Sequence, residues 1–443
     1  MRFNTKKFFE LARAHGFEAA DLNISKGHSM SMTLYHGEIE NYSEENTTDA
    51  VARGIINGKL GGCVTEKFDK NTIEFMIDSI EKTARVIETN DPVIIYKGSK
   101  KYHRGSYYNK ALFEVPFEEK KKILFEIEKK LFAYDKRINE VASVSYSESS
   151  EDSILQNSYG LKLKTKKSDF SIVAQITAKE KDEIRSNYAV FAGNNLKEFD
   201  IDKFVKELAD ETLKKLGSSQ CKSKKYPVIL NPDCSATLIR AFLSSTNAED
   251  VQKNSSLFIG KLHQQIASKK LTVTENPLTK NVFFDYYDDE GVAINKKDIV
   301  KKGVLQTYLY TLETAAKDGV EPTGNGYRGA GKASAGLGYI IVKPGRKSEE
   351  EMMSSIKEGV YITDLEGLHA GMNARSGNFS LQSQGFMIRD GKLAEPLSLI
   401  TISGNLVEMF NGIKDVGSNS KFLLGSKASC PSISFKKLFV SGE

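Results

Sequence analysis

The sequence lacks any apolar stretch long enough to cross a membrane. A spanning helix needs about 20 consecutive apolar residues, and none of the 443 residues belongs to a run that approaches this length. The N-terminal segment MRFNTKKFFELARAHGF contains acidic residues and no apolar core of the kind found in signal peptides. These absences predict a cytoplasmic protein.

Residues with nucleophilic or metal-binding side chains are also scarce. The chain has four cysteines and six histidines, and the cysteines, which form no CxxC pair, are Cys63, Cys221, Cys234 and Cys430. This spacing predicts reduced thiols with structural roles. No histidine belongs to an HExxH or HExxxH arrangement, and no GxSxG nucleophile motif occurs. Taken alone, these tests point away from hydrolytic chemistry.

A clustered basic region is missing as well. The chain has 63 Lys and Arg against 58 Asp and Glu, a net charge of +5, and the two signs are interleaved, as in FEEKKKILFEIEKK at residues 117–130. Proteins that bind nucleic acid usually gather their basic residues on one face. The pattern here predicts solvated helix surface and no direct contact with nucleic acid.

The length and periodicity predict a multi-domain α+β fold. A chain of this size exceeds what one hydrophobic core supports. In the N-terminal half, runs with strand periodicity are followed by a helix, and this order occurs twice; the C-terminal part predicts mainly antiparallel sheet. We predict domains over residues 1–95, 96–222 and 223–443, with a linker at residues 93–116.

Local signals locate several elements. Asn4 is placed to cap a first helix that Gly16 ends. Apolar spacing predicts helices over residues 72–88 and 117–133, and another that starts at Ile201 and ends at Gly217. Residues 20–64 predict short strands, with Asn57-Gly58 as a hairpin turn. Further helical patches are expected near residues 234–257 and 349–357.

The clearest long hairpin covers residues 377–405. Asp390-Gly391 suits a two-residue type I′ turn, which requires positive φ at both positions. Apolar residues alternate in one parity before residue 383 and in the other after residue 385, so we expect a β-bulge between them. The polar residues of this strand would then form a ridge beside His369, suited to holding a peptide; they are Asn378, Ser380, Gln382 and Gln384.

A glycine-rich segment, GNGYRGAGK at residues 324–332, matches both GxGxxG and GxxxxGK. A nucleotide site would need a buried strand before it, and a P-loop needs Ser or Thr after the lysine, where this chain has Ala333. A turn precedes the segment, so the sequence favours a flexible loop over a phosphate site.

The acidic run Asp285–Gly291 (DYYDDEG) offers carboxylates that could bind Ca²⁺ or Mg²⁺. It lacks the spacing of an EF-hand, and acids beside a glycine are typical of a solvated turn, which we expect here. A metal site assembled from distant residues such as His263, His369 and the 288–290 cluster stays open as an alternative.

Seven ordered motifs resemble the TldD/PmbA family, and the likeness extends over essentially the whole chain. They are SLFIGK (256–261), FDYYDDEG (284–291), GVLQTYL (303–309), TGNGYR (323–328), GLHAG (367–371), SGNFS (376–380) and ISGNL (402–406). Upstream, HGEIE at residues 36–40 and TNDP at residues 89–92 resemble the first domain of that family.

The resemblance can be tested against the two branches of the family. TldD-type members are zinc metallopeptidases with His-Glu-x-x-x-His on a helix and a cysteine ligand near the C-terminus, whereas PmbA-type members, also called TldE, lack the motif. The corresponding window here reads ATLIRAFLSST (236–246), without histidine or glutamate. Cys430 falls after the position of the cysteine ligand, so that role is not carried over. A metallopeptidase needs zinc to acidify water and a carboxylate to accept the proton.

The resemblance therefore implies a zinc-less PmbA-type subunit with no catalytic or metal-binding residues of its own. It would pair in the cytoplasm with a zinc-containing TldD-type subunit, or form a homodimer when isolated, and would act on unfolded peptides. The family is linked to maturation of peptide antibiotics, antitoxin turnover and modulation of DNA gyrase. We expect channel-wall or interface roles, or else turn and sheet roles, for Asn325, Arg328, His369, Asn378, Ser380 and Gln384. The alternatives are an autonomous metallopeptidase and a non-enzymatic regulator.

Overall fold

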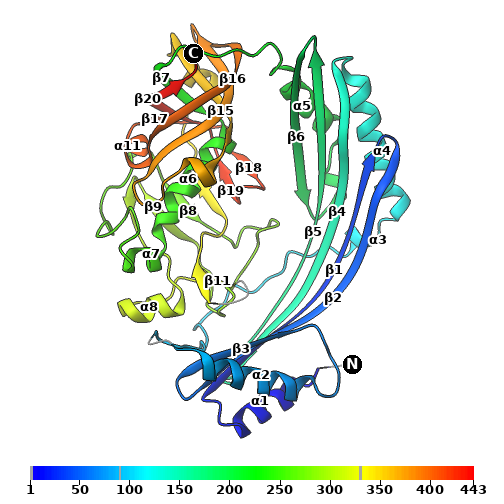
Figure 1. The fold of residues 1–443 in the computed structure, drawn as a ribbon, viewed down its shortest axis with the longest axis vertical. Coiled ribbons are helices and arrows are strands. Elements are labelled where there is room, and N and C mark those ends of the chain that lie inside the picture. The colour runs from blue at the N-terminus through cyan, green and yellow to red at the C-terminus, as the bar shows by residue number, and fades with distance from the viewer. Residues whose placement is uncertain (1–2, 89–90, 329–331) are drawn as a thin grey trace.

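The computed structural model describes residues 3–88, 91–328 and 332–443 (Figure 1). It confirms a multi-domain α+β fold with a sheet-rich C-terminal part. Three six-stranded sheets and one two-stranded hairpin make up the β-structure of these residues. No helix in the described residues is both long and apolar enough to cross a membrane.

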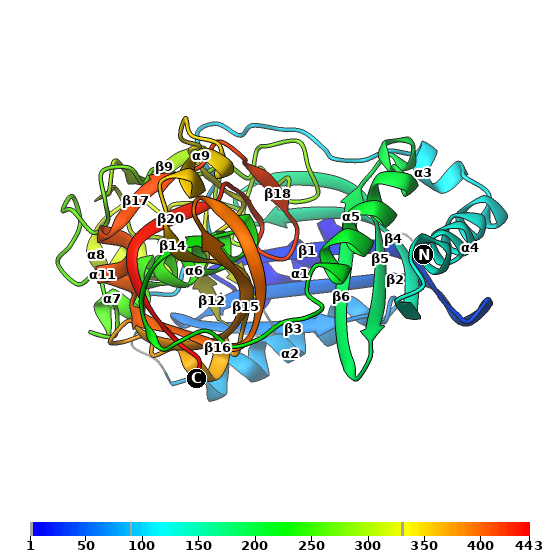
Figure 2. The same cartoon turned by 90° about the horizontal axis from the view of Figure 1, so that it is seen from above.

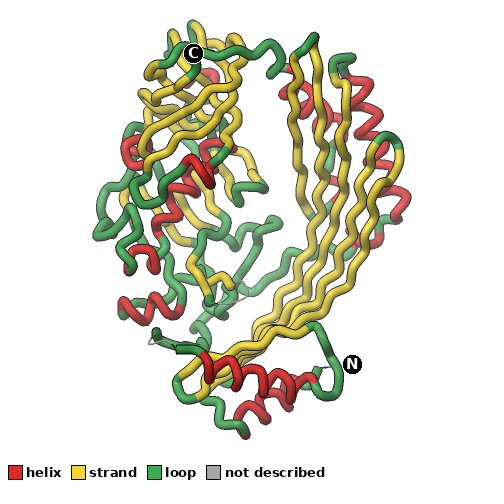
Figure 3. The backbone as a smooth tube through the Cα atoms, viewed as in Figure 1, coloured by secondary structure: helices red, strands yellow, loops and turns green. Residues whose placement is uncertain are grey.

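The N-terminal sheet has the order β3-β2-β1-β4-β5-β6. Its strands are β1 (Ala19–Tyr35), β2 (Glu38–Ile56), β3 (Lys59–Thr65), β4 (Ile138–Asn157), β5 (Lys162–Glu180) and β6 (Glu183–Gly193). Four of them are 17 to 20 residues long, and Figure 3 shows them curving together along the molecule. The expectation of short strands over residues 20–64 was wrong. The polar stretch at 38–49 pairs with β1 through its backbone, which hydrogen-bonds whatever side chains it carries.

Two pairs of helices cover the two ends of this sheet. At one end, α1 (Thr5–Ala14) and α2 (Thr72–Val86) bury Phe8 and Met76 in a core shared with β1–β3. At the other end, α4 (Phe117–Tyr134) and α5 (Ile201–Leu213) bury Leu124 and Leu208 against β4 and β5. The predicted Asn4 cap is confirmed, since its side chain accepts a hydrogen bond from Lys7 N at 3.1 Å.

The order helix, three strands, helix occurs twice, and β1 pairs with β4 to join the two halves into one sheet. This sheet crosses the boundary predicted at residue 95. The three domain ranges stay a prediction. The predicted linker at 93–116 is mostly irregular and includes the short helix α3 (Ala111–Glu114).

The C-terminal part contains two sheets with the orders β16-β15-β14-β7-β20-β17 and β10-β9-β8-β13-β19-β18. The first sheet is formed by β7 (Lys224–Leu230), β14 (Glu358–Glu366), β15 (Asn378–Arg389), β16 (Lys392–Asn405), β17 (Ile413–Val416) and β20 (Ile433–Ser441). The second is formed by β8 (Val273–Glu275), β9 (Lys297–Lys301), β10 (Val304–Leu305), β13 (Ile340–Val342), β18 (Lys421–Leu423) and β19 (Ala428–Cys430). Most pairs are antiparallel, but β7 with β14 and β13 with β19 are parallel.

Short helices and one hairpin complete this part. They are α6 (Pro232–Leu243), α7 (Ala248–Gln252), α8 (Leu312–Asp318), α9 (Glu349–Ser354), α10 (Leu368–Gly371), α11 (Leu406–Asn411) and the hairpin of β11 (Gly326–Arg328) with β12 (Ala333–Ala335). The helical patches predicted near 234–257 and 349–357 are confirmed by α6, α7 and α9. The glycine-rich segment, expected to be a loop, contains β11; residues 329–331 lie outside the described residues.

Both predicted hairpin turns are confirmed by backbone geometry. Asn57 and Gly58 have φ of 48° and 68°, and Asp390 and Gly391 have φ of 48° and 80°. A register shift also falls at residues 383–385, as expected, but β15 itself stays regular. The extra residues lie in its neighbours, because Thr363 of β14 and the 398–399 region of β16 are the unmatched positions. The apolar residues of β15 change parity because the strand faces a different hydrophobic core on each side.

Candidate functional site

Helix α6 contains most of the 236–246 window, which the resemblance aligns with the zinc-binding motif of TldD-type members. The Asn231 side chain caps it by accepting a hydrogen bond from Cys234 N at 2.8 Å, and Pro232 occupies its first turn. Its apolar face is buried in the main C-terminal core with Leu238 and Phe242. The helix therefore begins by local capping and is fixed in place by packing.

The polar residues of α6 are engaged in structural contacts. The Arg240 guanidinium donates to the carbonyl oxygens of Leu337 and Gly338, each at 3.0 Å. The Thr237 hydroxyl lies 3.3 Å from that of Ser426 in the turn between β18 and β19. These contacts join the helix to two neighbouring loops. The acidic residue of the helix, Asp233, is exposed.

A buried ionic cluster lies where the N-terminal sheet meets β11. Arg53 of β2 donates to both carboxylate oxygens of Asp21 of β1, with Nε 3.1 Å from each. Arg328 of β11 approaches the same carboxylate at 3.6 Å. Burial raises the pKa of Asp21, but Arg53 and Arg328 outweigh that effect, so its pKa is lowered overall. Within the described residues, Arg328 Nε and Nη2 have no hydrogen-bond acceptor.

Sequence reasoning missed Asp21 and Arg53. Each is a single charge inside an apolar stretch, AADL and AVARGII, and the two are direct cross-strand partners. A lone charge at such a position is a usable signal, because a charged side chain is rarely buried without a partner.

The acidic run 285–291 is not the solvated turn that we expected. Asp288 is 2% exposed and Glu290 is 7% exposed. The Asp288 carboxylate accepts from the backbone N–H groups of Gly326, Val292 and Glu290 at 2.8 to 3.0 Å. Burial, followed by the nearby Glu290, raises the pKa of Asp288 to about 7. These acids hold the 285–291 turn against β11, a contact between segments distant in sequence.

Asn325 and Arg328 belong to this same buried region. Asn325 is fully buried, and its side-chain N–H group donates to Glu275 Oε1 and to the Gly336 carbonyl, both at 2.8 Å. This burial favours the structural role over a channel-wall role for Asn325. The wall role of Arg328 stays a prediction.

The remaining four predicted residues lie along β15 and the helix before it. Asn378 and Ser380 are exposed and Gln384 is half-buried, all on the face opposite Leu381, and Asn378 Oδ1 accepts from Asn405 at 2.9 Å. His369 is exposed on α10, which packs directly on β15. The structure thus places these four around one strand, and in Figure 1 β15 lies in a different part of the C-terminal region from β11. Their function stays a prediction.

Comparison with known proteins identifies the family. The profile "PmbA/TldA metallopeptidase central domain" matches residues 110–216, and the profile "PmbA/TldA metallopeptidase C-terminal domain" matches residues 223–442. The chain belongs to the PmbA/TldD metallopeptidase family. Among its relatives, a metalloprotease of Methanocaldococcus jannaschii is 27% identical, covering 92% of this chain and 91% of the relative. The metalloprotease PmbA of Escherichia coli is 25% identical, covering 96% and 93%.

Two solved structures resemble this chain over almost its whole length. A Thermotoga maritima protein, described as a candidate modulator of a DNA gyrase, superposes with a TM-score of 0.90 at 27% identity over 99% of both chains. TldE from Thermococcus kodakarensis superposes with a TM-score of 0.89 at 21% identity over 99% of this chain and 100% of its own, a likeness of fold.

The residues of this PmbA/TldD family member do not fit a zinc ion at α6. The helix contains neither histidine nor glutamate. Cys234 of α6 and Cys430 of β19 are both buried, and these two elements contact each other. Burial raises the pKa of both thiols well above the usual value. A cysteine that binds zinc must be a thiolate, so these thiols are poor zinc ligands. Across residues 3–88, 91–328 and 332–443, no three His, Cys, Asp or Glu side chains are grouped so as to hold a metal.

Proposed function

We propose that this chain is the zinc-less, PmbA-type subunit of a cytoplasmic PmbA/TldD metallopeptidase complex that degrades or matures unfolded peptides. The observation that carries the proposal is the composition and engagement of α6. Its window lacks the histidines and the glutamate that zinc peptidase chemistry requires, and Arg240 and Thr237 are committed to neighbouring loops. In this proposal a TldD-type partner supplies zinc and catalysis.

The free edge of β6 supports a role in holding an extended peptide. Residues 186–193 contain no charge and no proline, and their pairing with β5 is regular throughout. Tyr188 and Val190 are 67% and 40% exposed. Edge strands usually carry charges, prolines or bulges that prevent pairing with another chain. On the opposite side of the same sheet, β3 pairs only with residues 50–56 of β2, so residues 38–49 of β2 form an edge, and they follow that rule with five acids.

The position of β6 agrees with this role. It is the strand of its sheet nearest to the C-terminal sheets in Figure 1, and Figure 2 shows α4 on the other side of that sheet from them. Main-chain pairing along an edge accepts any sequence, which suits a subunit that binds unfolded chains.

The deciding experiment measures zinc content and peptide cleavage on the purified chain, alone and with a TldD-type subunit. We expect no bound zinc and no cleavage by the chain alone, with cleavage restored by the partner. Near-stoichiometric zinc together with chelator-sensitive cleavage by the isolated chain would overturn the proposal.

A second measurement tests the β6 edge. The binding of a fluorescent unfolded peptide to Tyr188→Lys with Val190→Lys is compared with binding to Tyr42→Lys, a control at an exposed position on the opposite edge. A charge on the binding edge opposes strand addition, so we expect at least about fivefold weaker binding for the double variant and little change for the control. Equal binding by all three proteins would exclude β6 as the peptide edge.

A further inference from the structure

The C-terminal sheet is interrupted at Pro227, an internal position of β7. Proline has no N–H group to donate to a neighbouring strand. On one side, the pairing of β7 steps from Phe435 to Leu438, so the two residues Lys436 and Lys437 bulge opposite Pro227. On the other side, pairing with β14 starts only at Val360. The sheet is therefore open around Pro227.

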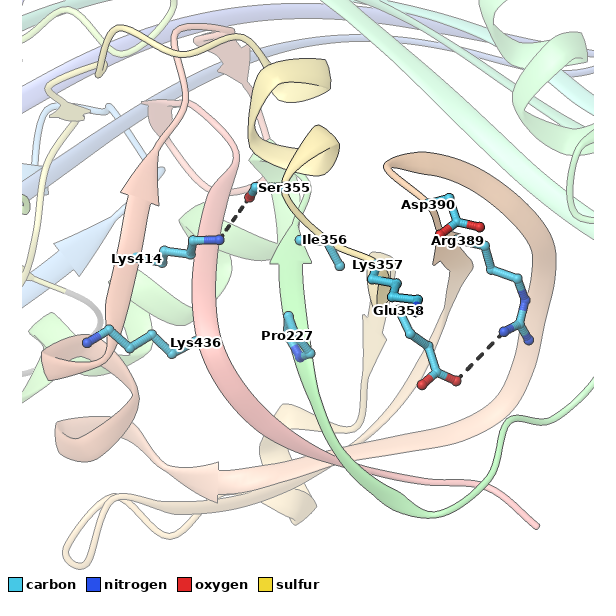
Figure 4. A pocket seen from close by; sticks show the side chains of 9 residues that line it. All are labelled: Pro227, Ser355, Ile356, Lys357, Glu358, Arg389, Asp390, Lys414 and Lys436. Carbon is cyan, nitrogen blue, oxygen red and sulfur yellow. Dashed lines mark hydrogen bonds and ion pairs between the residues drawn. The ribbon is translucent and has the colours of Figure 1, made fainter.

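This opening contains a cavity of about 820 Å³ (Figure 4). Its floor includes Pro227 and the buried Ile356, and its charged lining residues are Lys357, Glu358, Arg389, Asp390, Lys414 and Lys436. The volume lies within the range of about 300 to 1,000 Å³ that is typical of small-molecule sites. Four cationic side chains against two carboxylates make the lining positive.

Two of the charged lining residues, Glu358 and Arg389, are already paired with opposite charges. Glu358 Oε2 lies 2.6 Å from Lys224 Nζ, and its other oxygen lies 3.7 Å from Arg389. Arg389 Nε also donates to both carboxylate oxygens of Glu395, at 2.9 and 3.1 Å. These partners leave three lysines against the carboxylate of Asp390 as the lining charges without an ion pair in the described residues, so the balance stays positive.

Lys357, Lys414 and Lys436 have no carboxylate within ion-pair distance among the residues that the structure describes. Lys414 Nζ donates to Ser355 Oγ at 2.9 Å, which directs it to the wall of the cavity. Figure 4 shows Lys414 and Lys436 on one side of β7 and Lys357 on the other. Positive charge therefore borders the opening from two sides.

We propose that this cavity binds a small anion with two or more linked phosphate groups. Lysine is a compact point charge that pairs well with phosphate oxygens, and lysines on both sides of β7 match a ligand with more than one such group. A peptide added as a strand does not fit, because β7 already has β14 and β20 as neighbours. The proposal concerns the break in pairing at Pro227 and is independent of the residues of α6 and of peptide binding.

Calorimetric titration of the full-length chain at constant ionic strength tests the proposal, with pyrophosphate, orthophosphate and ADP as the probes. We expect saturable binding of pyrophosphate, tighter than that of orthophosphate. Stronger binding of ADP than of pyrophosphate would assign the cavity to a nucleotide, and equal binding would assign it to the phosphate chain alone. No saturable binding of pyrophosphate or ADP at millimolar concentration would overturn the proposal.

Matched variants separate the cavity from general surface charge. Lys414→Gln and Lys436→Gln each remove one lining cation, whereas Lys437→Gln removes an exposed charge from the same bulge outside the cavity. We expect the Kd for pyrophosphate to rise at least about fivefold in the first two variants and less than about twofold in the third. Equal losses in all three would overturn the assignment. Unchanged thermal unfolding midpoints would verify that the variants are folded.

Discussion

Replacement of Arg53 by methionine should loosen the N-terminal sheet where it contacts β11. The change leaves the Asp21 carboxylate 4% exposed and without its closest partner. Removing one member of a buried ion pair typically costs about 3 to 5 kcal/mol. Because Arg328 stays 3.6 Å from Asp21 and compensates part of the charge, we expect the low end, about 3 kcal/mol.

Hydrogen exchange of the β1 and β2 amides is the suitable assay, since a chain with several cores does not unfold in two states. A loss of about 3 kcal/mol corresponds to roughly 150-fold faster exchange at these amides. The pKa of Asp21 is lowered in the folded chain, so its contribution is present above the pKa of an unfolded aspartate, about 4, and disappears as the pH falls through its lower folded value. The defect should therefore be complete at pH 7.

The control is Arg375→Met, which removes an exposed arginine in a turn and should change exchange by less than about 0.5 kcal/mol. Adding Asp21→Asn to Arg53→Met should recover part of the loss, because the uncompensated carboxylate is then gone. If Arg53→Met behaved like Arg375→Met, the buried pair would not contribute to the stability of this contact.

Four further outcomes follow from the structure. Leu238→Ala should lower the free energy of local opening by about 2 to 5 kcal/mol, measured by hydrogen exchange of the surrounding amides, because it leaves a cavity in the core under α6. Gly391→Ala should cost about 1 kcal/mol or more by the same assay, since φ is 80° and the added methyl would lie 2.8 Å from Ser354 Cα, while Gly425→Ala, in open space, should be near neutral. The raised pKa of Asp288 means that stability falls as pH rises from about 4 through about 7, and Asp288→Asn should flatten that dependence in melting curves. A chelator should leave the thermal midpoint unchanged, and a marked fall would reveal a structural metal.

The elements that were predicted correctly depend on residues close together in the chain. The Asn57-Gly58 and Asp390-Gly391 turns need two adjacent residues with positive φ, and the helix at 72–86 needs an apolar stripe with its own periodicity. Such signals are complete within a short window. Their boundaries were accordingly reproduced to within a residue or two.

The failures depend on partners distant in sequence. The carboxylate of Asp288 is buried because Gly326 presents a backbone N–H group to it, and nothing near residue 288 indicates that contact. In the same way, nothing near Asn325 in the sequence indicates its contact with Glu275, and the predicted role of Asn325 stays a prediction. Side-chain type alone predicted exposure for the acidic run 285–291, and tertiary hydrogen bonds reversed it.

The candidate site was predictable in one respect only. The missing histidine and glutamate in α6 can be read from the sequence once the family is recognised. The sequence does not predict the hydrogen bonds from Arg240 to the carbonyl groups of residues 337 and 338. Those residues are almost 100 positions away and carry no motif.

The packing of α6 shows that apolar contacts alone can hold this helix in place. The helix buries one face, which includes Leu238 and Phe242, in the core between the two C-terminal sheets. Hydrophobic burial of that face fixes its position without help from a metal, since each such side chain contributes about 1.5 to 3 kcal/mol. The residues on the other face can then vary without displacing the helix. In this chain two of them, Arg240 and Thr237, hydrogen-bond to neighbouring loops. The proposed loss of catalysis is therefore physically compatible with retention of the surrounding surfaces in one chain.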